Sequence, residues 1–320
     1  PHELLLVPVS CRTPVVCGDV PAHDGDEEEM AVPEGDTVWL VAKRLDDALS
    51  GDVLTRTDVR VPQLATADLV GRRVIETVPR GKHLLTRVEG AVTLHTHLRM
   101  DGMWHLHRPG ARWTGGAEHQ IRVLLSTSAW DAVGYRLHDV ALVPTDREHD
   151  LVGHLGPDVL DPAGFDAGEA VRRLHEQPGR EVGQALLDQR NLAGVGNLYK
   201  AETLFIARVS PWTPVSEVPD LTDVVATAAR LIGRNKGHWS QTTTGDPRRQ
   251  HYVFECGGRA CRRCGGVIAT AMQGDAPYDR ITYWCPACQP GPHPEPMPLR
   301  RNRGGSGAYD RRVRRSGRER

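Results

Sequence analysis

The chain has 320 residues, room for two or three packed units, and no run of about eighteen apolar residues that would predict a membrane-spanning helix. Its net charge of −1 combines −6 over residues 1–32 with +5 over residues 33–320, and this basic part favours a polyanionic partner. The first residues lack the basic region and cleavage site of a signal peptide. We therefore expect a cytoplasmic protein with no membrane partner.

The first half of the chain predicts one helix followed by many short strands. Residues 1–32 show no helical or strand periodicity. Between Glu34 and Ser50 apolar residues recur at helical spacing, with Asp36 as the expected cap and Gly51 as the stop. From Val53 to about Pro144, short runs rich in β-branched residues follow one another, which predicts a β-sandwich or barrel.

The second half of the chain changes character twice. Residues 149–245 are mainly helical in pattern, with the clearest helical segments at 181–189, 198–209 and 221–233. Residues 251–289 return to strand patterns around a group of cysteines. After Pro290 the content of proline, glycine and arginine predicts a disordered basic tail.

Four cysteines predict a structural zinc site. Cys261 and Cys264 form one C-x2-C pair, Cys285 and Cys288 form another, and twenty residues separate the pairs. Four thiolates complete a tetrahedral site and leave no position for a reactive water, so we expect one zinc ion per chain with a purely structural role. A redox C-x2-C is the alternative, which the presence of two matched pairs disfavours. Cys256 has no partner in this pattern.

Three further motifs lie upstream of the cysteines: Pro33-Glu34-Gly35, Arg80-Gly81-Lys82 and the run from Leu192 to Asn197 (LAGVGN). Together with the zinc motif, in this order and spacing, they resemble the formamidopyrimidine-DNA glycosylase/endonuclease VIII family, and the second endonuclease VIII subgroup most of all. Each motif alone would be a weak signal. The resemblance extends over about residues 33–289.

The resemblance implies an α+β multidomain fold: an N-terminal helix with a β-sandwich, a helix–two-turn–helix domain, and a C-terminal zinc-finger β-hairpin. The corresponding expected boundaries are 33–148 for the catalytic helix and sandwich, 149–250 for the helical DNA-binding domain, 251–289 for the zinc finger and 290–320 for the tail.

Pro33 is the expected nucleophile. In the family this is the secondary amine of an N-terminal proline, whereas a proline inside a chain has only an amide nitrogen. We therefore expect residues 1–32 to be a false extension. A GTG codon for Val32 could serve as the start, and Glu27-Glu28-Glu29 needs purine-rich codons, as a ribosome-binding site does. A genuine pro-segment and an inert relative are the alternatives.

The resemblance implies further catalytic roles. Glu34 would protonate the sugar ring oxygen, and as an acidic residue at a helix start it would also favour the helix. Lys82 would contact phosphate and donate a proton during elimination. The alternative interpretation is an exposed lysine with no catalytic role. Arg280 on the zinc hairpin would clamp phosphates and assist the second elimination.

The resemblance also implies DNA contacts. Met100 would fill the gap left by an extruded base, with core packing as the alternative, and Arg99 would contact DNA beside it. Asn197 would contact phosphate, although its motif also suits a plain helix–helix turn. His154 stands where endonuclease VIII relatives carry a DNA-contacting arginine.

Two departures from the family pattern bear on the chemistry and the substrate. Asp36-Thr37 replaces the Pro-Glu of many relatives, which leaves the second acidic residue in doubt. The segment 243–254 is shorter than the lid of purine-specific relatives, which favours oxidised pyrimidines as substrates.

The predicted function is a monomeric, bifunctional DNA glycosylase and abasic-site lyase of base excision repair, acting on damaged double-stranded DNA at the nucleoid. It would proceed through a Schiff base on Pro33 and β,δ-elimination. An abasic-site lyase with little glycosylase activity is one alternative. An inert lesion-binding protein is the other, and it would hold if Pro33 is never freed.

Overall fold

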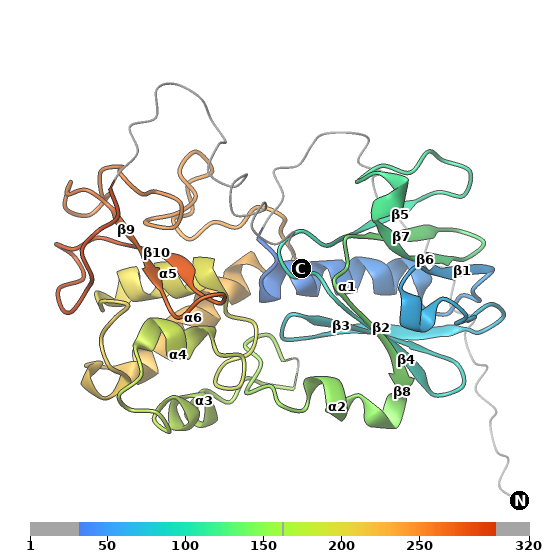
Figure 1. Ribbon diagram of the computed structural model, residues 1–320, viewed down its shortest axis with the longest axis horizontal. Coiled ribbons are helices and arrows are strands. Elements are labelled where there is room, and N and C mark those ends of the chain that lie inside the picture. The colour runs from blue at the N-terminus through green and yellow to red at the C-terminus, as the bar shows by residue number, and fades with distance from the viewer. Residues whose placement is uncertain (1–31, 162, 299–320) are drawn as a thin grey trace, which may run out of the picture. The chain divides into compact units, whose positions relative to one another are not determined.

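The computed structural model describes residues 32–161 and 163–298, which belong to one compact unit (Figure 1). The expected false extension, apart from Val32, and the tail from residue 299 onward lie outside these described residues. Among the residues described, no helix is both long and apolar enough to cross a membrane.

Helix α1 (Gly35–Leu49) forms where the sequence predicts it. Its buried face carries Val38, Leu45 and Leu49, and the chain leaves the helix through Gly51, whose φ of +87° suits glycine. The expectation that Asp36 caps this helix is wrong. Glu34 occupies the N-cap position, while Asp36 lies inside the first turn with no exposed surface, because its carboxylate is bonded to other parts of the chain.

Two antiparallel sheets form the expected β-sandwich. The first has the strand order β1-β6-β7-β5 and the second β2-β3-β4-β8. The strands are β1 (Arg56–Val59), β2 (Val74–Arg80), β3 (His83–Val88), β4 (Val92–His97), β5 (Met103–His107), β6 (Ile121–Ser126), β7 (Asp131–Tyr135) and β8 (Asp139–Pro144). Leu84 and Leu94 from one sheet and Val123 from the other pack into a shared core with α1.

A helical part follows the sandwich. Its helices are α2 (His149–Val152), α3 (Ala167–Leu174), α4 (Val182–Leu187), α5 (Asn197–Ala207) and α6 (Leu221–Asn235). Helix α5 lies at its centre: Tyr199, Leu204 and Phe205 have no exposed surface, and α4 and α6 both contact this helix. The turn between α4 and α5 contains the expected glycine-rich motif.

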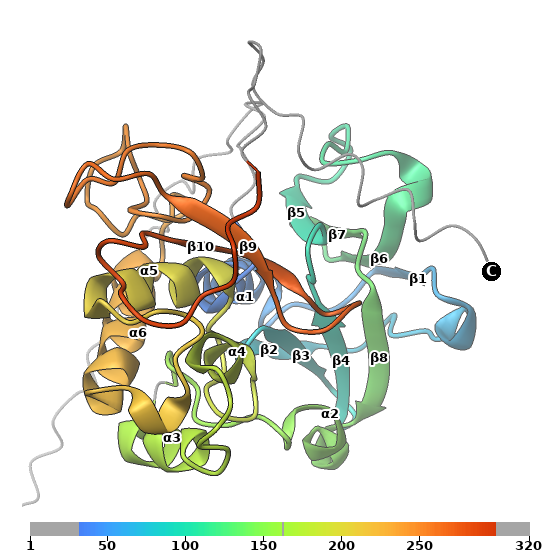
Figure 2. The same ribbon diagram turned by 60° about the vertical axis from the view of Figure 1, so that its left-hand side comes forward.

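Strands β9 (Ala269–Gln273) and β10 (Arg280–Trp284) form an antiparallel hairpin that lies beside α5 (Figures 1 and 2). The indole of Trp284 is fully buried and packs edge-on against Trp212 from the helical part. The hairpin therefore shares its core with the helices. The expected fold class is confirmed in all three of its parts.

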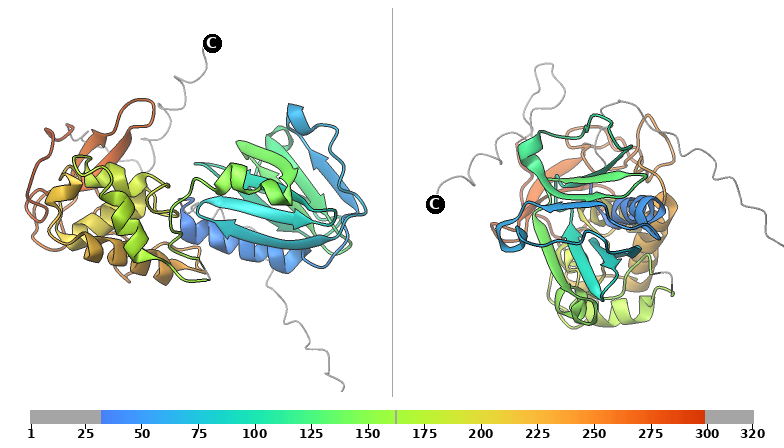
Figure 3. Two further views of the ribbon diagram at one scale, coloured as in Figure 1. Left: turned by 90° about the horizontal axis from the view of Figure 1, so that it is seen from below. Right: turned by 90° about the vertical axis from the view of Figure 1, so that its right-hand side faces the viewer.

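Helix α1 connects the sandwich to the helical part. Figure 3 shows α1 running along the sandwich with one end at the helices. Its packing agrees with this view, because α1 contacts β2, β3 and β5 as well as α6. Residues 33 and 34 precede this helix, so they lie where the sandwich, α5 and α6 meet.

Candidate active site

The Glu34 side chain is fixed against the N-terminus of α5. It is 1% exposed, and its Oε1 accepts a hydrogen bond from the Leu198 N–H at 2.7 Å and its Oε2 one from the Gly196 N–H at 2.8 Å. The first N–H groups of a helix have no partner within the helix and attract negative charge. The residue that precedes α1 and the glycine-rich turn are thereby joined across 162 residues of sequence.

Lys82 approaches the same point as Glu34. A Cβ atom added to Gly196 would lie 2.5 Å from Glu34 Oε1 and 2.7 Å from Lys82 Nζ, so both side chains use the space that this glycine leaves open. Burial raises the pKa of Glu34 to about 7, with Lys82 opposing the shift. Burial lowers the pKa of Lys82, with Glu34 opposing. The raised pKa makes the Glu34 carboxyl a suitable proton donor near pH 7, and the lowered pKa makes the Lys82 ammonium group a stronger acid than an exposed lysine.

The turn that carries Lys82 is anchored to the helical part. Gly81 has a φ of +57°, and its N–H donates to Asp158 Oδ2 at 2.6 Å. Arg80 reinforces the contact through Asp161, with Nη1 and Oδ2 separated by 3.4 Å. The Arg80-Gly81-Lys82 motif is therefore a docking turn that places the lysine beside Glu34.

A buried polar network surrounds the start of α1. Asp36 accepts hydrogen bonds from the Tyr199 hydroxyl and from Gln241 Nε2, the latter at 3.0 Å to Oδ1. Burial raises the pKa of Asp36, and burial also raises that of Tyr199. The sequence analysis did not identify Tyr199 or Gln241. The one available signal was the replacement of Pro-Glu by Asp36-Thr37, which places an acid one position earlier.

The hairpin is bonded to α5 through two side chains of that helix. Asn197 Nδ2 donates to the Ile281 carbonyl at 2.9 Å, and Lys200 Nζ donates to Thr282 Oγ1 at 2.6 Å. Lys200 is fully buried, and burial lowers its pKa to about 7. These bonds hold β10, which begins with the exposed Arg280. The side chain of Asn197 thus contacts the hairpin; its predicted phosphate contact stays a prediction.

Arg99 and Met100 lie in the loop between β4 and β5. Met100 is 67% exposed, so it is not a core residue. Arg99 has a φ of +55°, and its Nε lies 2.6 Å from Asp139 Oδ2 on β8. The loop therefore presents an apolar side chain to solvent beside a braced arginine, as an intercalating wedge requires.

His154 is exposed at the edge of a group of histidines. Its ring centroid lies 6.2 Å from that of His83, which in turn bonds His95 with 2.8 Å between Nδ1 and Nε2. Burial lowers the pKa of His83 to about 3 and that of His97 to about 4. With these pKa values the rings of His83 and His97 carry no positive charge at physiological pH.

The four cysteines converge as the sequence predicts. The sulfur atoms of Cys261, Cys264, Cys285 and Cys288 all lie within 4.8 Å of one another. Zinc–sulfur bonds of about 2.3 Å in a tetrahedron place sulfurs about 3.8 Å apart. The separations here are 3.5 Å for Cys264–Cys285 and 3.9 Å for Cys261–Cys288. The cluster fits a zinc ion.

Known proteins match this chain over nearly all of the described part. Residues 32–141 match the formamidopyrimidine-DNA glycosylase N-terminal domain, and residues 155–230 match the H2TH domain of the same glycosylase. The chain is 52% identical to probable endonuclease 8 2 of Streptomyces coelicolor over 83% of this chain and 96% of that protein. The chain belongs to the formamidopyrimidine-DNA glycosylase/endonuclease VIII family.

Other relatives agree with this membership. The DNA-(apurinic or apyrimidinic site) lyase Nei2 of Mycolicibacterium smegmatis is 43% identical over 81% of this chain and 99% of its own length. Lactococcus lactis Fpg, solved in complex with DNA containing an abasic site, shares the fold with a TM-score of 0.67 at 22% identity, over 81% of this chain and all of that one. The predicted resemblance to the second endonuclease VIII subgroup is thus confirmed.

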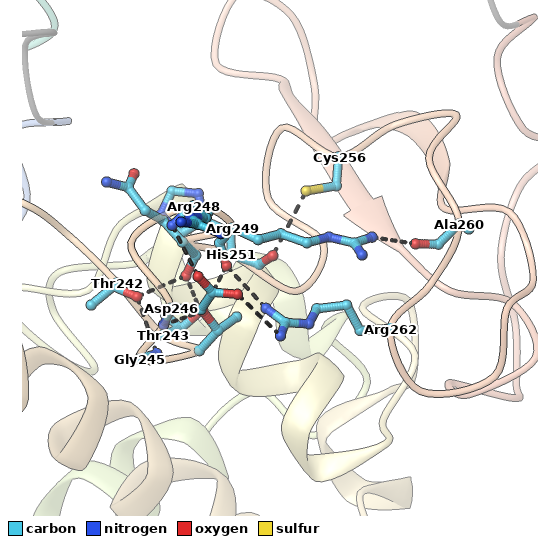
Figure 4. Close-up of polar contacts among 12 residues, drawn as sticks. Thr242, Thr243, Gly245, Asp246, Arg248, Arg249, His251, Cys256, Ala260 and Arg262 are labelled. Atoms are coloured by element: carbon cyan, nitrogen blue, oxygen red, sulfur yellow. Dashed lines mark hydrogen bonds and ion pairs between the residues drawn. The ribbon is translucent and has the colours of Figure 1, made fainter.

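In this protein the segment that follows α6 is a compact loop held together by polar contacts (Figure 4). The Gln250 carbonyl accepts a hydrogen bond from the Thr243 N–H at 2.8 Å, closing the loop on itself. Arg249 Nη2 donates to the Ala260 carbonyl at 2.6 Å, and Arg262 reaches back to Asp246 at 3.5 Å. The segment is therefore tied to the region of the cysteines.

Glu202 of α5 anchors the end of the same segment. Its Oε1 accepts hydrogen bonds from the N–H groups of Val253 at 2.7 Å and Phe254 at 2.8 Å. Helix α5 thus contacts Glu34 at its start, the hairpin through Lys200, and this segment through Glu202. One helix therefore positions Glu34, the hairpin and this segment relative to one another.

Replacing Gly196 by alanine should disrupt the site. The new Cβ would lie 2.4 Å from Glu34 Cδ and 2.7 Å from Lys82 Nζ, so one or both side chains must move. We expect covalent trapping on abasic DNA to fall by about 10²-fold, because displacements of about 1 Å at a reacting centre have effects of this size. Gly233→Ala on α6 is the control, because a Cβ there meets no atom within 4 Å. Equal trapping by both variants would contradict the shared use of this space.

Proposed function

We propose that this protein is a bifunctional DNA glycosylase and abasic-site lyase that uses the amine of Pro33 as its nucleophile. The observation that carries the proposal is the convergence of Glu34 and Lys82 on Gly196, beside Pro33. In the active protein Pro33 would be the first residue, because only then does its nitrogen have the lone pair that attack requires. Residues 1–32 would accordingly be absent.

The reaction divides the chemistry among these groups. The Pro33 nitrogen attacks C1′ of the damaged nucleotide and loses its proton, and the glycosidic bond breaks with its electron pair leaving on the base, which takes up a proton. Glu34 gives a proton to O4′ as the sugar ring opens, which leaves an iminium between Pro33 and C1′. Loss of a proton from C2′ then expels the 3′ phosphate, and loss of the C4′ proton in a second elimination expels the 5′ phosphate. Lys82 supplies a proton, and Lys82 and Arg280 hold the phosphates.

Oxidised pyrimidines in double-stranded DNA are the proposed substrates. The segment 243–254 is short and bonded to itself and to its neighbours, so it has no free length with which to cover a larger base. Arg99, Met100, His154 and Asn197 would contact the DNA, with Met100 filling the gap left by the extruded base. Binding should weaken with salt because phosphate contacts displace counterions.

The remaining proposals concern the state of the protein. It would work as a monomer at the nucleoid in the cytoplasm, with domains at 33–148, 149–250 and 251–289 and a basic tail over 290–320. One structural zinc ion per chain would be held by Cys261, Cys264, Cys285 and Cys288, fixing the hairpin without taking part in the chemistry.

Borohydride trapping on abasic DNA tests the proposal. Protein that begins at Pro33 should give a stable covalent adduct, because borohydride reduces the iminium to an amine. A chain in which Val32 still precedes Pro33 should give none, since an amide nitrogen does not form an iminium. Base-release assays on oxidised pyrimidines, on 8-oxoguanine and on preformed abasic sites then separate the bifunctional enzyme from a lyase with little glycosylase activity.

Two results would contradict the proposal. Protein that begins at Pro33 and binds abasic DNA without forming an adduct would instead be an inert lesion-binding protein. Recovery of residues 1–32 by N-terminal sequencing of active native protein would overturn the start at Pro33.

A further inference from the structure

The acyl group of Val32 occupies the position that the substrate must take. Its carbonyl carbon is bonded to the Pro33 nitrogen, and its carbonyl oxygen accepts three hydrogen bonds. The donors are the Glu34 N–H at 2.7 Å, Gln241 Nε2 at 3.1 Å and Thr37 Oγ1 at 3.2 Å. Two of these donors are side chains, and Gln241 is 209 residues distant in the sequence.

The connectivity of this group matches that of the first covalent intermediate. When the amine of Pro33 attacks the aldehyde of an abasic sugar, C1′ becomes bonded to nitrogen and carries an oxygen. The sequence of atoms is nitrogen, carbon, oxygen in both cases. C1′ therefore takes the place of the Val32 carbonyl carbon, and in one rotamer about the new N–C1′ bond its oxygen takes the place of the Val32 oxygen.

We propose that Gln241 and Thr37 donate hydrogen bonds to the oxygen on C1′ while Pro33 forms its bond to the sugar. This inference rests on the proposed function, since it requires Pro33 to be the free nucleophile. It assigns to Gln241 and Thr37 the task that an oxyanion hole performs in acyl transfer, which is to hold the oxygen whose charge increases as the bond forms.

The step balances with these groups alone. The Pro33 lone pair forms the N–C1′ bond, and the electron pair of the aldehyde π bond moves to the oxygen, which gains a proton as the nitrogen loses one. This carbinolamine then expels its oxygen as water when a second proton arrives, and the nitrogen lone pair forms the iminium. Gln241 and Thr37 stabilise the oxygen during addition, and no oxidant or reductant is needed.

The two donors are held in place before substrate arrives. Gln241 is 5% exposed, and its Nε2 also donates to Asp36 Oδ1 at 3.0 Å. Its backbone carbonyl accepts a hydrogen bond from His251 Nε2 at 3.0 Å. Thr37 is likewise 5% exposed, within the first turn of α1. Donors fixed in advance need no reorganisation during the reaction, which is the condition for a large effect on rate.

Glu34 does not replace these donors. Both of its carboxylate oxygens accept hydrogen bonds from N–H groups at the start of α5. This arrangement leaves its proton for ring opening, and the oxygen on C1′ needs donors from elsewhere. Gln241 and Thr37 are the side chains that the structure places on that oxygen position.

The test uses protein that begins at Pro33, in parent form and as Gln241→Leu, Thr37→Val and Thr37→Ser. Gln250→Leu is the matched control, because Gln250 lies in the same segment but is exposed and bonds Ser240. Two quantities are measured for each: the single-turnover rate of borohydride-trapped adduct on abasic DNA, and the Kd for DNA carrying a tetrahydrofuran site. The tetrahydrofuran analogue has no oxygen on C1′ outside its ring and cannot form the adduct.

We expect Gln241→Leu to slow trapping by about 10²-fold and Thr37→Val by about 10-fold, with Kd for the tetrahydrofuran DNA unchanged. Thr37→Ser keeps the hydroxyl and should recover most of the parent rate, and Gln250→Leu should match the parent. Thermal melting identifies any variant that fails to fold. If Gln241→Leu is unfolded, the test rests on the trapping rate of Thr37→Val, because valine has nearly the same size and shape as threonine.

Three results would overturn the inference. In the first, Thr37→Val and Gln241→Leu form the trapped adduct at the parent rate. In the second, both variants lose adduct formation and binding of tetrahydrofuran DNA by the same factor, which would indicate a purely structural role for the two side chains. If the parent forms no adduct at all, the proposed function fails and this inference fails with it. The first two results leave the proposed function intact, so the two failures are distinguishable.

Discussion

Replacing Cys285 by alanine should release the zinc ion and abolish strand cleavage. The hairpin β9–β10 has only two strands, and a structure of that size is marginal without further support. Structural zinc contributes on the order of 10 kcal/mol to the folding of small modules. Without the ion, β10 keeps its contacts with α5 and Trp212 but loses the support of the metal, so Arg280 at its start is held less firmly near the reaction centre. Zinc content per chain, thermal melting and gel assays of cleavage measure the three effects.

Cys256 provides the matched control for this experiment. It is buried like Cys285 but lies outside the four-cysteine cluster, and the one hydrogen bond described for its sulfur is a weak one to the His251 carbonyl at 3.8 Å. Cys256→Ala should retain about one equivalent of zinc and parent activity. Zinc bound at the parent level by Cys285→Ala would show that this cluster does not hold the metal.

Glu34→Gln should slow release of a damaged base by on the order of 10²- to 10⁴-fold, the usual contribution of a general acid. The amide keeps the size of the side chain but has no proton to give to O4′. A preformed abasic sugar is already partly open in water, so borohydride trapping on abasic DNA should fall far less. The ratio of the two rates, measured in single turnovers, isolates the role of Glu34 in ring opening from any role in binding.

The pH dependence gives an independent check on the same residue. Because burial raises the pKa of Glu34 to about 7, the carboxyl group is largely protonated below that pH and loses its proton above it. The protonated form is the one that acts as an acid, so base release by the parent should decline as pH rises through about 7. Glu34→Gln should lack this decline. Glu118→Gln, which changes an exposed glutamate, should behave as the parent. A decline of equal size in Glu34→Gln would assign the titration to another group.

Local sequence patterns were sufficient for much of this architecture. Helical spacing between Val38 and Leu49 predicted α1, and the matched C-x2-C pairs predicted the sulfur cluster, because both signals depend on residues close in the sequence. Four motifs in register were enough to predict the family. These features share a physical cause: regular backbone geometry and metal coordination impose fixed spacings on the chain.

The polar network around Pro33 could not be predicted in the same way. Gln241 and Tyr199 reach Asp36 from more than 160 positions away, and no spacing rule connects residues that meet only through tertiary packing. Asp36 was therefore taken for a helix cap, the usual local role of aspartate. The Arg263 guanidinium carbon lies 4.2 Å from the centroid of the Phe205 ring on α5, a contact that no local pattern indicates. In each case a distant partner determines what the side chain does.

The dependence of Glu34 on α5 has a consequence for newly made protein. During translation Pro33 and Glu34 emerge long before Gly196 and Leu198, which Glu34 needs as partners, and the cysteines of the hairpin emerge later still. At about 5–20 residues per second, the ribosome takes on the order of 10 s or more to supply these partners. In a chain that begins at Pro33, as proposed, the proline is throughout that interval a solvent-exposed amine with no buried acid beside it. An unfinished chain of this kind thus lacks the fixed acid that the proposed ring opening requires.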